Sequence, residues 1–481
     1  MHDRIDAYLN SVCEQIRWKR AREGTAQELL THLLDQTDAY VELGMDEDTA
    51  IRESVRQMGD PVETGALLDR IHRPKSQWRL FFLVGLLLVM GYITQTTLRE
   101  VAAITVYANY DPLFYEALWL RRTIPGVLLM LLVYFLDYTI LARRPLLYFW
   151  AGIAGSLVVL LNSQRFSGRY YEFQQWMLLS PLLLALLVYS MRGKKLFGLL
   201  SCLCGTALLS GMAMLIPNIT MALLIFCSGI LLTVLSVAHG WMKLPVKRTL
   251  ILIGSFLLLS VAILCWHIIF NGYYLRRILI VFNPKQDPWA TGYQILLTRS
   301  ILSSARWIGQ GEVSFNGYHS VEQILPELES ASLLTWLIHR QGWLAGLILI
   351  GVFVLFLGWM LNKSLRHRSV LGSLISTAVV FTLTLQVISF VLYNLGFPII
   401  GNLSLPLINY GRWRTAITLG MIGLTLSVFR EEELPVKQNI PKEHNRHSSI
   451  SEFIFWQNGN LVIAVSQLKK LLLRPFNPFD E

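Results

Sequence analysis

Blocks of apolar residues long enough to cross a membrane, separated by short polar segments, are the feature that most restricts the fold of this chain. About 20 mostly apolar residues span the roughly 30 Å hydrocarbon core of a bilayer as a helix. Only 15% of the residues are charged, whereas soluble domains contain about a quarter. We therefore predict an all-α polytopic membrane protein with about ten transmembrane helices. The candidate spans are 80–97, 123–141, 145–162, 174–191, 196–214, 219–237, 249–270, 333–361, 370–393 and 410–429.

Arginine and lysine residues are concentrated in every second connection between these blocks. Examples are Arg143 and Arg144, then Lys194 and Lys195, and later the segment 363–368. Short cytoplasmic loops are enriched in Lys and Arg, so this alternation predicts that both termini face the cytoplasm. The N-terminus lacks the apolar stretch of a cleavable signal peptide. Because topology accounts for the placement of the net charge of +10, no nucleic-acid partner is expected.

The same topology places a long connection, residues 272–332, on the outer side of the membrane. Connections of this length within a compact domain usually carry function or are disordered. This one contains WATGYQILLTRSILSSARWIG, an apolar and basic stretch. We expect it to form an amphipathic helix along the membrane interface.

The two ends of the chain are too polar to cross a membrane. Residues 1–75 are predicted to form a cytoplasmic helical domain, with an apolar stripe at Leu29, Leu30, Leu33 and Leu34 and a further helix over 46–58. Its ELGMDEDTAIRESVRQMGDP segment resembles the small prefix domain of some bacterial permeases. Residues 431–481 are predicted to form a cytoplasmic tail with a short basic helix near 468–473.

The outer connection carries a set of motifs in RRILIVFNPKQDPWATGYQ, followed by GQG at 309–311 and LPE at 325–327. A second set, LSLPLINYG, precedes the last predicted span. These motifs resemble those of the SEDS family, the FtsW/RodA/SpoVE group of cell-wall glycosyltransferases, and the resemblance covers residues 80–430. The matching residues of the first motif are Phe282, Asn283, Pro284, Asp287, Pro288, Gly292, Tyr293 and Gln294.

The resemblance implies a function in peptidoglycan synthesis during cell division, cell shape control or sporulation, in a bacterial cytoplasmic membrane. Proteins of this family polymerise lipid II, a disaccharide pentapeptide on undecaprenyl pyrophosphate, usually beside a class B penicillin-binding protein. The expected partners are therefore such a transpeptidase or another SEDS protein, and lipid II or a similar polyprenyl-pyrophosphate sugar. No cofactor is evident, although the resemblance admits a divalent cation that would stabilise the leaving pyrophosphate.

The sequence departs from the family at the position of its essential acid, an Asp four residues after the Glu of LPE. Here that position is Ala331, which cannot accept a proton. One interpretation is a catalytically weak relative that binds a lipid-linked precursor or a partner enzyme. The alternative is an active, divergent glycosyltransferase with Glu329 or Glu327 as the base. A third function, transport of the lipid precursor, is least favoured because charges within the spans are scarce.

Cationic residues near the outer face are candidate ligands for a pyrophosphate. Arg412 and Arg414 stand at the outer start of the last span, where a guanidinium could bind phosphate oxygens or anchor to lipid headgroups. On the resemblance, the residues expected to bind substrate are Arg276, Arg277, Asn283, Asp287, Tyr293, Gln294, Tyr410, Arg412 and Arg414. No metal ligand is assigned.

Overall fold

The computed structural model describes most of the chain in two compact units. One unit comprises Met1–His72 with Leu434–Glu481, and the other comprises Arg73–Glu433. The described residues are 3–72, 77–105, 112–166, 169–214, 219–270, 272–312, 320–328, 330–399, 401–409, 411–430, 454–457 and 460–463. The predicted basic helix of the tail, near 468–473, lies outside these ranges.

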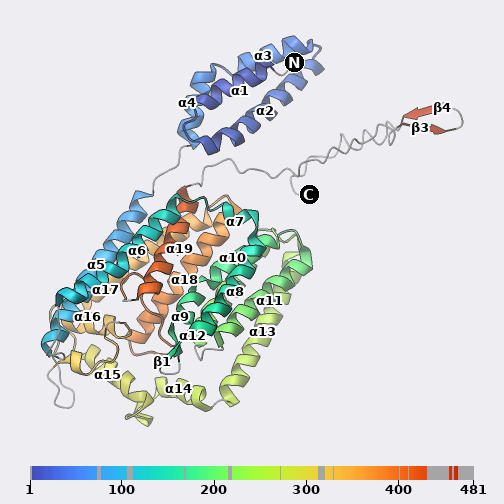
Figure 1. Ribbon diagram of the computed structural model, residues 1–481. Helices are drawn as coiled ribbons and strands as arrows, with labels where there is room; N and C mark the ends of the chain where they lie inside the picture. Colours follow the sequence, from blue (N-terminus) through green and yellow to red (C-terminus); the bar gives the residue numbers. More distant parts are fainter. Residues whose placement is uncertain are drawn as a thin grey trace. The chain divides into compact units, whose positions relative to one another are not determined.

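The first unit contains four helices (Figure 1), and its helices fall where the sequence predicts helical structure. They are α1 (Asp3–Gln15), α2 (Lys19–Glu42), α3 (Glu47–Gln57) and α4 (Pro61–His72). Asp46 caps α3 by accepting the backbone N–H of Thr49 at 3.1 Å, as expected for an Asp at this position. Leu33 of the predicted stripe is fully buried, whereas Leu34, also assigned to the stripe, is 37% exposed. The tail contributes a hairpin of β3 (Ile454–Gln457) and β4 (Asn460–Ile463).

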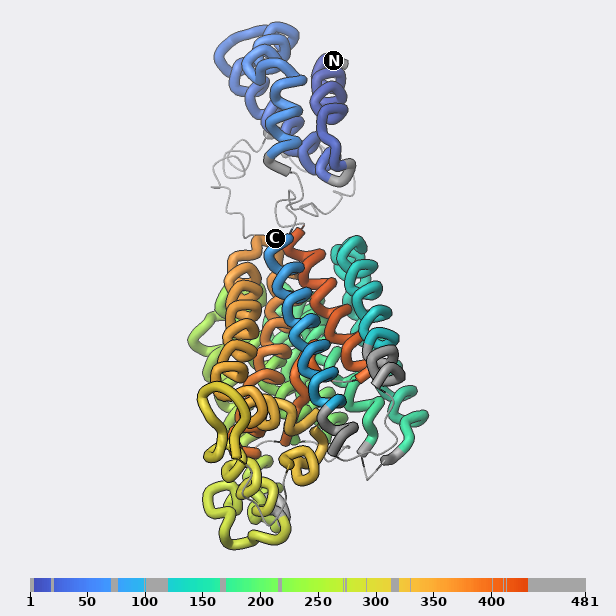
Figure 2. The backbone as a smooth tube through the Cα atoms, turned by 90° about the vertical axis from the view of Figure 1, so that its left-hand side faces the viewer, coloured from blue at the N-terminus to red at the C-terminus, as the bar shows by residue number. Residues whose placement is uncertain are grey.

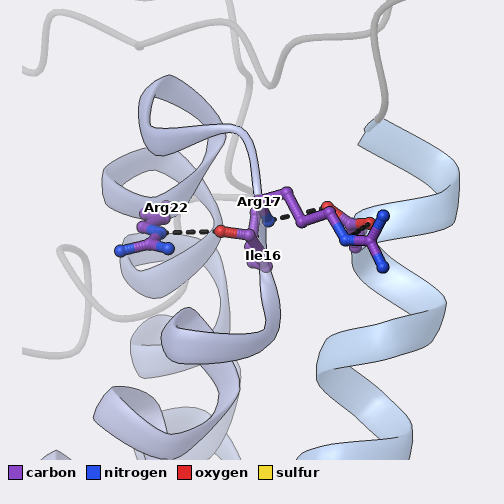
Figure 3. A network of polar contacts seen from close by, with 4 residues as sticks. Ile16, Arg17 and Arg22 are labelled. Carbon is purple, nitrogen blue, oxygen red and sulfur yellow. Dashed lines mark hydrogen bonds and ion pairs between the residues drawn. The ribbon is translucent and has the colours of Figure 1, made fainter.

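Polar contacts at the turn between α1 and α2 hold this unit together (Figure 3). The side chain of Arg22 donates from Nε to the carbonyl of Ile16 at 2.7 Å. The backbone N–H of Arg17 donates to the Asp69 carboxylate at 2.8 Å. The turn is thereby joined to both α2 and α4.

The second unit is a bundle of long apolar helices that run side by side (Figure 2). In chain order its first half consists of α5 (Trp78–Thr105), α6 (Pro112–Phe135), α7 (Ile140–Arg143), α8 (Pro145–Asn162), a two-residue hairpin of β1 (Arg165–Phe166) and β2 (Arg169–Tyr170), α9 (Tyr171–Trp176), η1 (Met177–Leu179), α10 (Ser180–Ser190), α11 (Lys195–Met214) and α12 (Ile219–Ala238). The second half consists of α13 (Val246–Phe270), α14 (Gly272–Phe282), η2 (Pro284–Gln286), α15 (Thr291–Ser303), η3 (Val321–Gln323), α16 (Leu333–Gln341), α17 (Trp343–Leu365), α18 (Val370–Asn394) and α19 (Arg412–Arg430).

Eight helical segments within the described residues are long and apolar enough to cross a membrane. They are α5, α8, the continuous α9–η1–α10 segment, α11, α12, α13, α17 and α18. The second and tenth predicted spans correspond to α6 and α19, which pack against each other in the same bundle. The prediction of an all-α polytopic membrane protein is therefore confirmed.

Two apolar cores stabilise the bundle. One gathers residues of α5, α6 and α15–α19 around Trp336 and Phe353, and the other gathers residues of α8–α12 around Phe173. By contrast, only 11% of the apolar stretch of α13 is buried within the bundle. The cysteines of the apolar helices are free thiols; Cys202 is buried, whereas Cys204, Cys227 and Cys265 are exposed on the surface of the bundle.

The eighth predicted span, 333–361, is not one continuous helix in the structure. Instead of one helix over 333–361, the chain forms α16 and α17 with a break at Gly342, whose φ is +100°. A Cβ at this position would lie 2.5 Å from the carbonyl oxygen of Trp307. The close approach of another backbone segment and a left-handed conformation both require glycine here. His339 and Arg340 consequently belong to α16, outside the membrane-spanning helix.

The predicted helix in the outer connection exists as α15. Its apolar side joins the bundle core through Leu297 and Ile301, both less than 5% exposed. The connection is therefore packed against the ends of the spanning helices.

Candidate functional site

The LPE motif forms a tight turn directly before α16. Glu327 adopts a left-handed backbone conformation with φ of +48°. Its carbonyl oxygen accepts the N–H groups of Ser330 at 3.0 Å and Ala331 at 2.9 Å. Its carboxylate accepts the Ser330 hydroxyl at 3.4 Å and belongs to an exposed residue. The turn thus presents the Glu327 carboxylate at the surface.

Ala331 lies inside this turn and is 3% exposed. Its carbonyl oxygen accepts an N–H of the Asn394 side-chain amide at 2.8 Å. The amide oxygen of Asn394 accepts the backbone N–H of Thr335 at 3.0 Å. The Asn394 side chain thus hydrogen-bonds both the turn and the first turn of α16. These bonds fix the start of α16 to the end of α18. Glu329, the other candidate base, lies outside the described residues.

The LSLPLINYG segment packs against the same turn. Asn409 donates from its side chain to the carbonyl of Ser330 at 2.7 Å, and Gln95 of α5 donates to the carbonyl of Ile408 at 3.3 Å. The Oδ1 atom of Asn409 is buried and has no hydrogen-bond partner within the described part of the chain. Tyr410 lies outside that part. The segment therefore links α5 to the turn and leaves one buried acceptor there.

Arg414, in the first turn of α19, places a positive charge near the turn that contains Glu327. The residue is partly buried, and the negative charge of Glu327 lies near enough to attract its guanidinium. The structure therefore brings together two of the predicted site residues, one from the outer connection and one from the last helix. The backbone of Arg412 begins α19, but its side chain lies outside the description.

The FNP, DP and GYQ motifs mainly hold the outer connection in shape. The side chain of Asp287 pairs with Arg276 at 3.4 Å, and its carbonyl accepts the N–H of Gly292 at 3.0 Å. A Cβ on Gly292 would lie 2.2 Å from the carbonyl oxygen of Pro284, so only glycine fits this turn. Gln294 donates to the hydroxyl of Tyr393 on α18.

The remaining predicted residues of this connection differ in exposure. Asn283 is exposed before η2, Arg277 is partly buried on α14, and Tyr293 packs partly buried against the bundle core. Among the described residues, no hydrogen bond or ion pair joins Asn283 or Arg277 to Glu327 or Arg414.

Within the described ranges, no cluster of three or more His, Cys, Asp and Glu side chains is placed to hold a metal ion. The divalent cation that the resemblance admits stays a prediction.

A family model with the description "Cell cycle protein", for the FtsW, RodA and SpoVE group, matches residues 77–434. The chain belongs to this family. It is 28% identical over 180 residues to the "Probable peptidoglycan glycosyltransferase FtsW" of Thioalkalivibrio sp., covering 36% of this chain and 44% of that one. It is 22% identical over 223 residues to the "Peptidoglycan glycosyltransferase MrdB" of Escherichia coli, covering 45% of this chain and 56% of that one. The matches thus span about half the length of these curated relatives.

A solved structure supports the same fold. A chain from "Structural coordination of polymerization and crosslinking by a peptidoglycan synthase complex" superposes with a TM-score of 0.56 at 21% identity. The superposition covers 74% of this chain and 98% of that chain. The second unit therefore has the fold of that chain, and the four helices of the first unit precede the matched residues 77–434.

Sequence reasoning missed Arg299, which anchors the outer connection of this family member. Its guanidinium donates to the carbonyls of Gly396 and Val281, both at 3.0 Å, and stacks 4.8 Å from the ring centre of Phe397. A single arginine inside the apolar face of α15 was the available signal. Asn394, at the end of an apolar span, was a similar signal.

Two further polar side chains, those of Glu322 and His339, are buried behind the turn. Glu322 is 7% exposed and accepts the indole N–H of Trp336 at 2.7 Å. His339 is 2% exposed, and its Nε2 faces the carbonyl of Glu312 at 3.4 Å. Burial lowers the pKa of His339 below its ordinary value, against the opposing effect of the Glu312 carbonyl and the Glu322 charge. A neutral imidazole that donates from Nε2 fits this geometry.

Proposed function

We propose that this protein serves peptidoglycan synthesis and binds lipid II, or a similar polyprenyl-pyrophosphate sugar, at the face formed by Glu327 and Arg414. Family membership and the names of the curated relatives support the pathway. The guanidinium of Arg414 supplies the donors that a pyrophosphate requires. Glu327 supplies an acceptor for sugar hydroxyl or peptide N–H groups.

The burial of Ala331 supports an inference of weak catalysis. Glycosyl transfer needs a base to take the proton of the acceptor hydroxyl as it attacks the anomeric carbon. The family's Asp is replaced by a methyl group, and the backbone around it is held by Asn394. We infer that the protein binds the precursor with little or no polymerisation.

A polymerisation assay on the purified protein, with and without Mg²⁺, tests this inference. We expect bound lipid II but no glycan product from the natural protein. Ala331→Asp should produce polymer, whereas the isosteric, uncharged Ala331→Asn should not. Polymer made by the natural protein would refute the inference of weak catalysis.

The alternative, an active divergent enzyme, is favoured by the exposed carboxylate of Glu327 at the turn. If this alternative holds, the natural protein polymerises lipid II, and Glu327→Gln or Glu329→Gln abolishes the product. Activity that survives both changes would exclude these two residues as the base.

The binding site itself is tested by Arg414→Gln. We expect retention of labelled lipid II to fall about tenfold or more, as for loss of a charge-assisted contact of about 1.5–3 kcal/mol. The matched control is Arg306→Gln, because Arg306 is an exposed arginine of the outer connection paired only with the exposed Glu312 in the described contacts. Equal losses in both variants would contradict a specific role for Arg414.

The proposed orientation places both termini in the cytoplasm of a bacterial cell. In a cysteine-free background, Lys285→Cys should react with an impermeant thiol reagent in intact cells. Lys194→Cys, which is also exposed in the structure, should react only after lysis. The reverse pattern would remove the substrate-binding proposal, because lipid II polymerisation takes place outside the membrane.

We also propose that the bundle associates with a class B penicillin-binding protein or another SEDS protein. The superposed structure is described as a complex that coordinates polymerization and crosslinking. Crosslinking in cells followed by mass spectrometry should recover such a partner. Recovery of no cell-wall enzyme would count against the proposal.

A further inference from the structure

An apolar groove runs between α5 and α17, which lie side by side in the bundle (Figure 2). Its volume is about 430 Å³, and its lining is Trp78, Arg79, Phe82, Leu83, Leu355 and Trp359. Trp78, Phe82 and Leu355 are 73%, 69% and 66% exposed. Within a membrane, these walls face lipid.

A cationic side chain, that of Arg79, lines the groove at the start of α5. Arg79 follows the first residue of α5, and its guanidinium lies 5.1 Å from the ring centre of Trp359. Stacking on an indole orients a guanidinium while its N–H groups stay available for an acceptor. Phe82 and Leu83 follow Arg79 by three and four residues, so they lie below it on the same side of α5.

The helix on the other side repeats this arrangement. Leu355, Trp359, Lys363 and Arg366 recur at spacings of three or four residues and therefore share one side of α17. The apolar members line the groove, and the two cations follow in the last turn and just beyond it. Positive charge is thus collected where α5 begins and α17 ends.

We propose that this groove binds one anionic glycerophospholipid, with an acyl chain along the apolar walls and the phosphate at Arg79. Basic sites between transmembrane helices at the membrane surface favour anionic headgroups. The volume favours a lipid chain over a protein helix. A helix about 10 Å across would fill a groove of this size with about one 5.4 Å turn.

Native mass spectrometry of the full chain in detergent tests this site, with phosphatidylglycerol and phosphatidylcholine of the same chain length as probes. We expect phosphatidylglycerol to bind about fivefold more tightly. Arg79→Gln should abolish that preference, since about 1 kcal/mol for one basic contact corresponds to about fivefold. Arg79→Lys should keep most of it and shows that the variant protein folds.

The matched control is Arg192→Gln. Arg192 also stacks on an aromatic ring, with its guanidinium 3.9 Å from the ring centre of Tyr189, but it does not line the groove. Its loss should leave the preference unchanged. Equal binding of the two lipids, or an equal effect of Arg192→Gln and Arg79→Gln, would overturn the proposal.

A photoreactive residue at Phe82 identifies the occupant in cells. We expect an adduct with the mass of a phospholipid. A protein-sized adduct would show that a partner helix fills the groove and would refute the lipid assignment. Neither outcome depends on whether the protein polymerises lipid II.

Discussion

The side-chain amide of Asn394 donates to the carbonyl oxygen of Ala331 at 2.8 Å and thereby joins the end of α18 to the turn before α16. The same side chain accepts from Thr335, so its loss leaves several buried polar groups without partners. An unsatisfied buried group costs about 1–3 kcal/mol. We expect Asn394→Ala to destabilise the protein by about 2 kcal/mol or more in thermal unfolding in detergent.

Asn162→Ala is the control for this prediction. Asn162 also donates from its side chain to a backbone carbonyl, that of Val158 at 2.8 Å, but it is exposed at the end of α8. Its change should cost less than about 0.5 kcal/mol. Similar losses for the two variants would contradict a special role for the bond to Ala331.

A second prediction concerns the break between α16 and α17. Gly342→Ala places a Cβ 2.5 Å from the carbonyl oxygen of Trp307 at a φ of +100°. Strain of this kind costs about 1–3 kcal/mol. We expect a clear decrease in Tm.

Gly351→Ala provides the comparison, because a Cβ there meets no atom within 4 Å in the middle of α17. Alanine is favoured over glycine inside a helix by about 0.5–1 kcal/mol, so Tm should stay constant or rise. A Tm for Gly342→Ala at or above that of the natural protein would show that the break is not required.

A third prediction concerns pH. Burial lowers the pKa of His339 from its ordinary value of 6.5 in the folded state. The unfolded state then binds more protons as the pH falls below 6.5, so the stabilising contribution is present above that pH and is lost on acidification. We expect His339→Gln to reduce the loss of Tm between about pH 7.5 and about pH 5.5.

His239→Gln is the control for the pH experiment, because it removes an exposed histidine whose ring hydrogen-bonds the Leu235 carbonyl and stacks on Trp241. Its pH profile should match that of the natural protein. A profile unchanged by His339→Gln would show that another group dominates the acid sensitivity.

A fourth prediction concerns the anchor of the outer connection. Arg299→Ala removes three hydrogen bonds, two to the carbonyl of Gly396 and one to that of Val281. We expect hydrogen exchange in α15 to rise about tenfold or more, because hydrogen bonds from a charged group are worth about 1.5–3 kcal/mol. Arg306→Ala, which breaks only an exposed ion pair, should change this exchange little. Equal exchange in the two variants would place the anchor elsewhere.

The arrangement of spanning helices followed from the sequence because each block of apolar residues matches the thickness of a bilayer. The break at Gly342 did not, since the polar HRQ directly before the glycine is short and apolar residues lie on both sides of it in LLTWLIHRQGWLAGLIL. A glycine inside an apolar run has many structural roles, and only the backbone of Trp307 beside it decides this one.

The candidate site was predictable in part. The spacing from LPE pointed to Ala331, and the position at the start of the last span pointed to Arg414. The partners of motif residues could not be predicted, because the contact of Gln294 with Tyr393 joins positions 99 residues apart. The same holds for Asn394 and Ala331, which a spacing argument within one segment cannot connect.

The early end of α16 also changes the energetics of inserting this segment into the bilayer. A span that began at Leu333 would carry Arg340 into the hydrocarbon, and a charge at its centre costs about 2.5–3.5 kcal/mol on insertion scales. With the spanning helix starting at Trp343, the bilayer receives a stretch that carries no charged residue before Lys363. The break at Gly342 thus ends α16 before the spanning helix begins, and Arg340 stays out of the hydrocarbon.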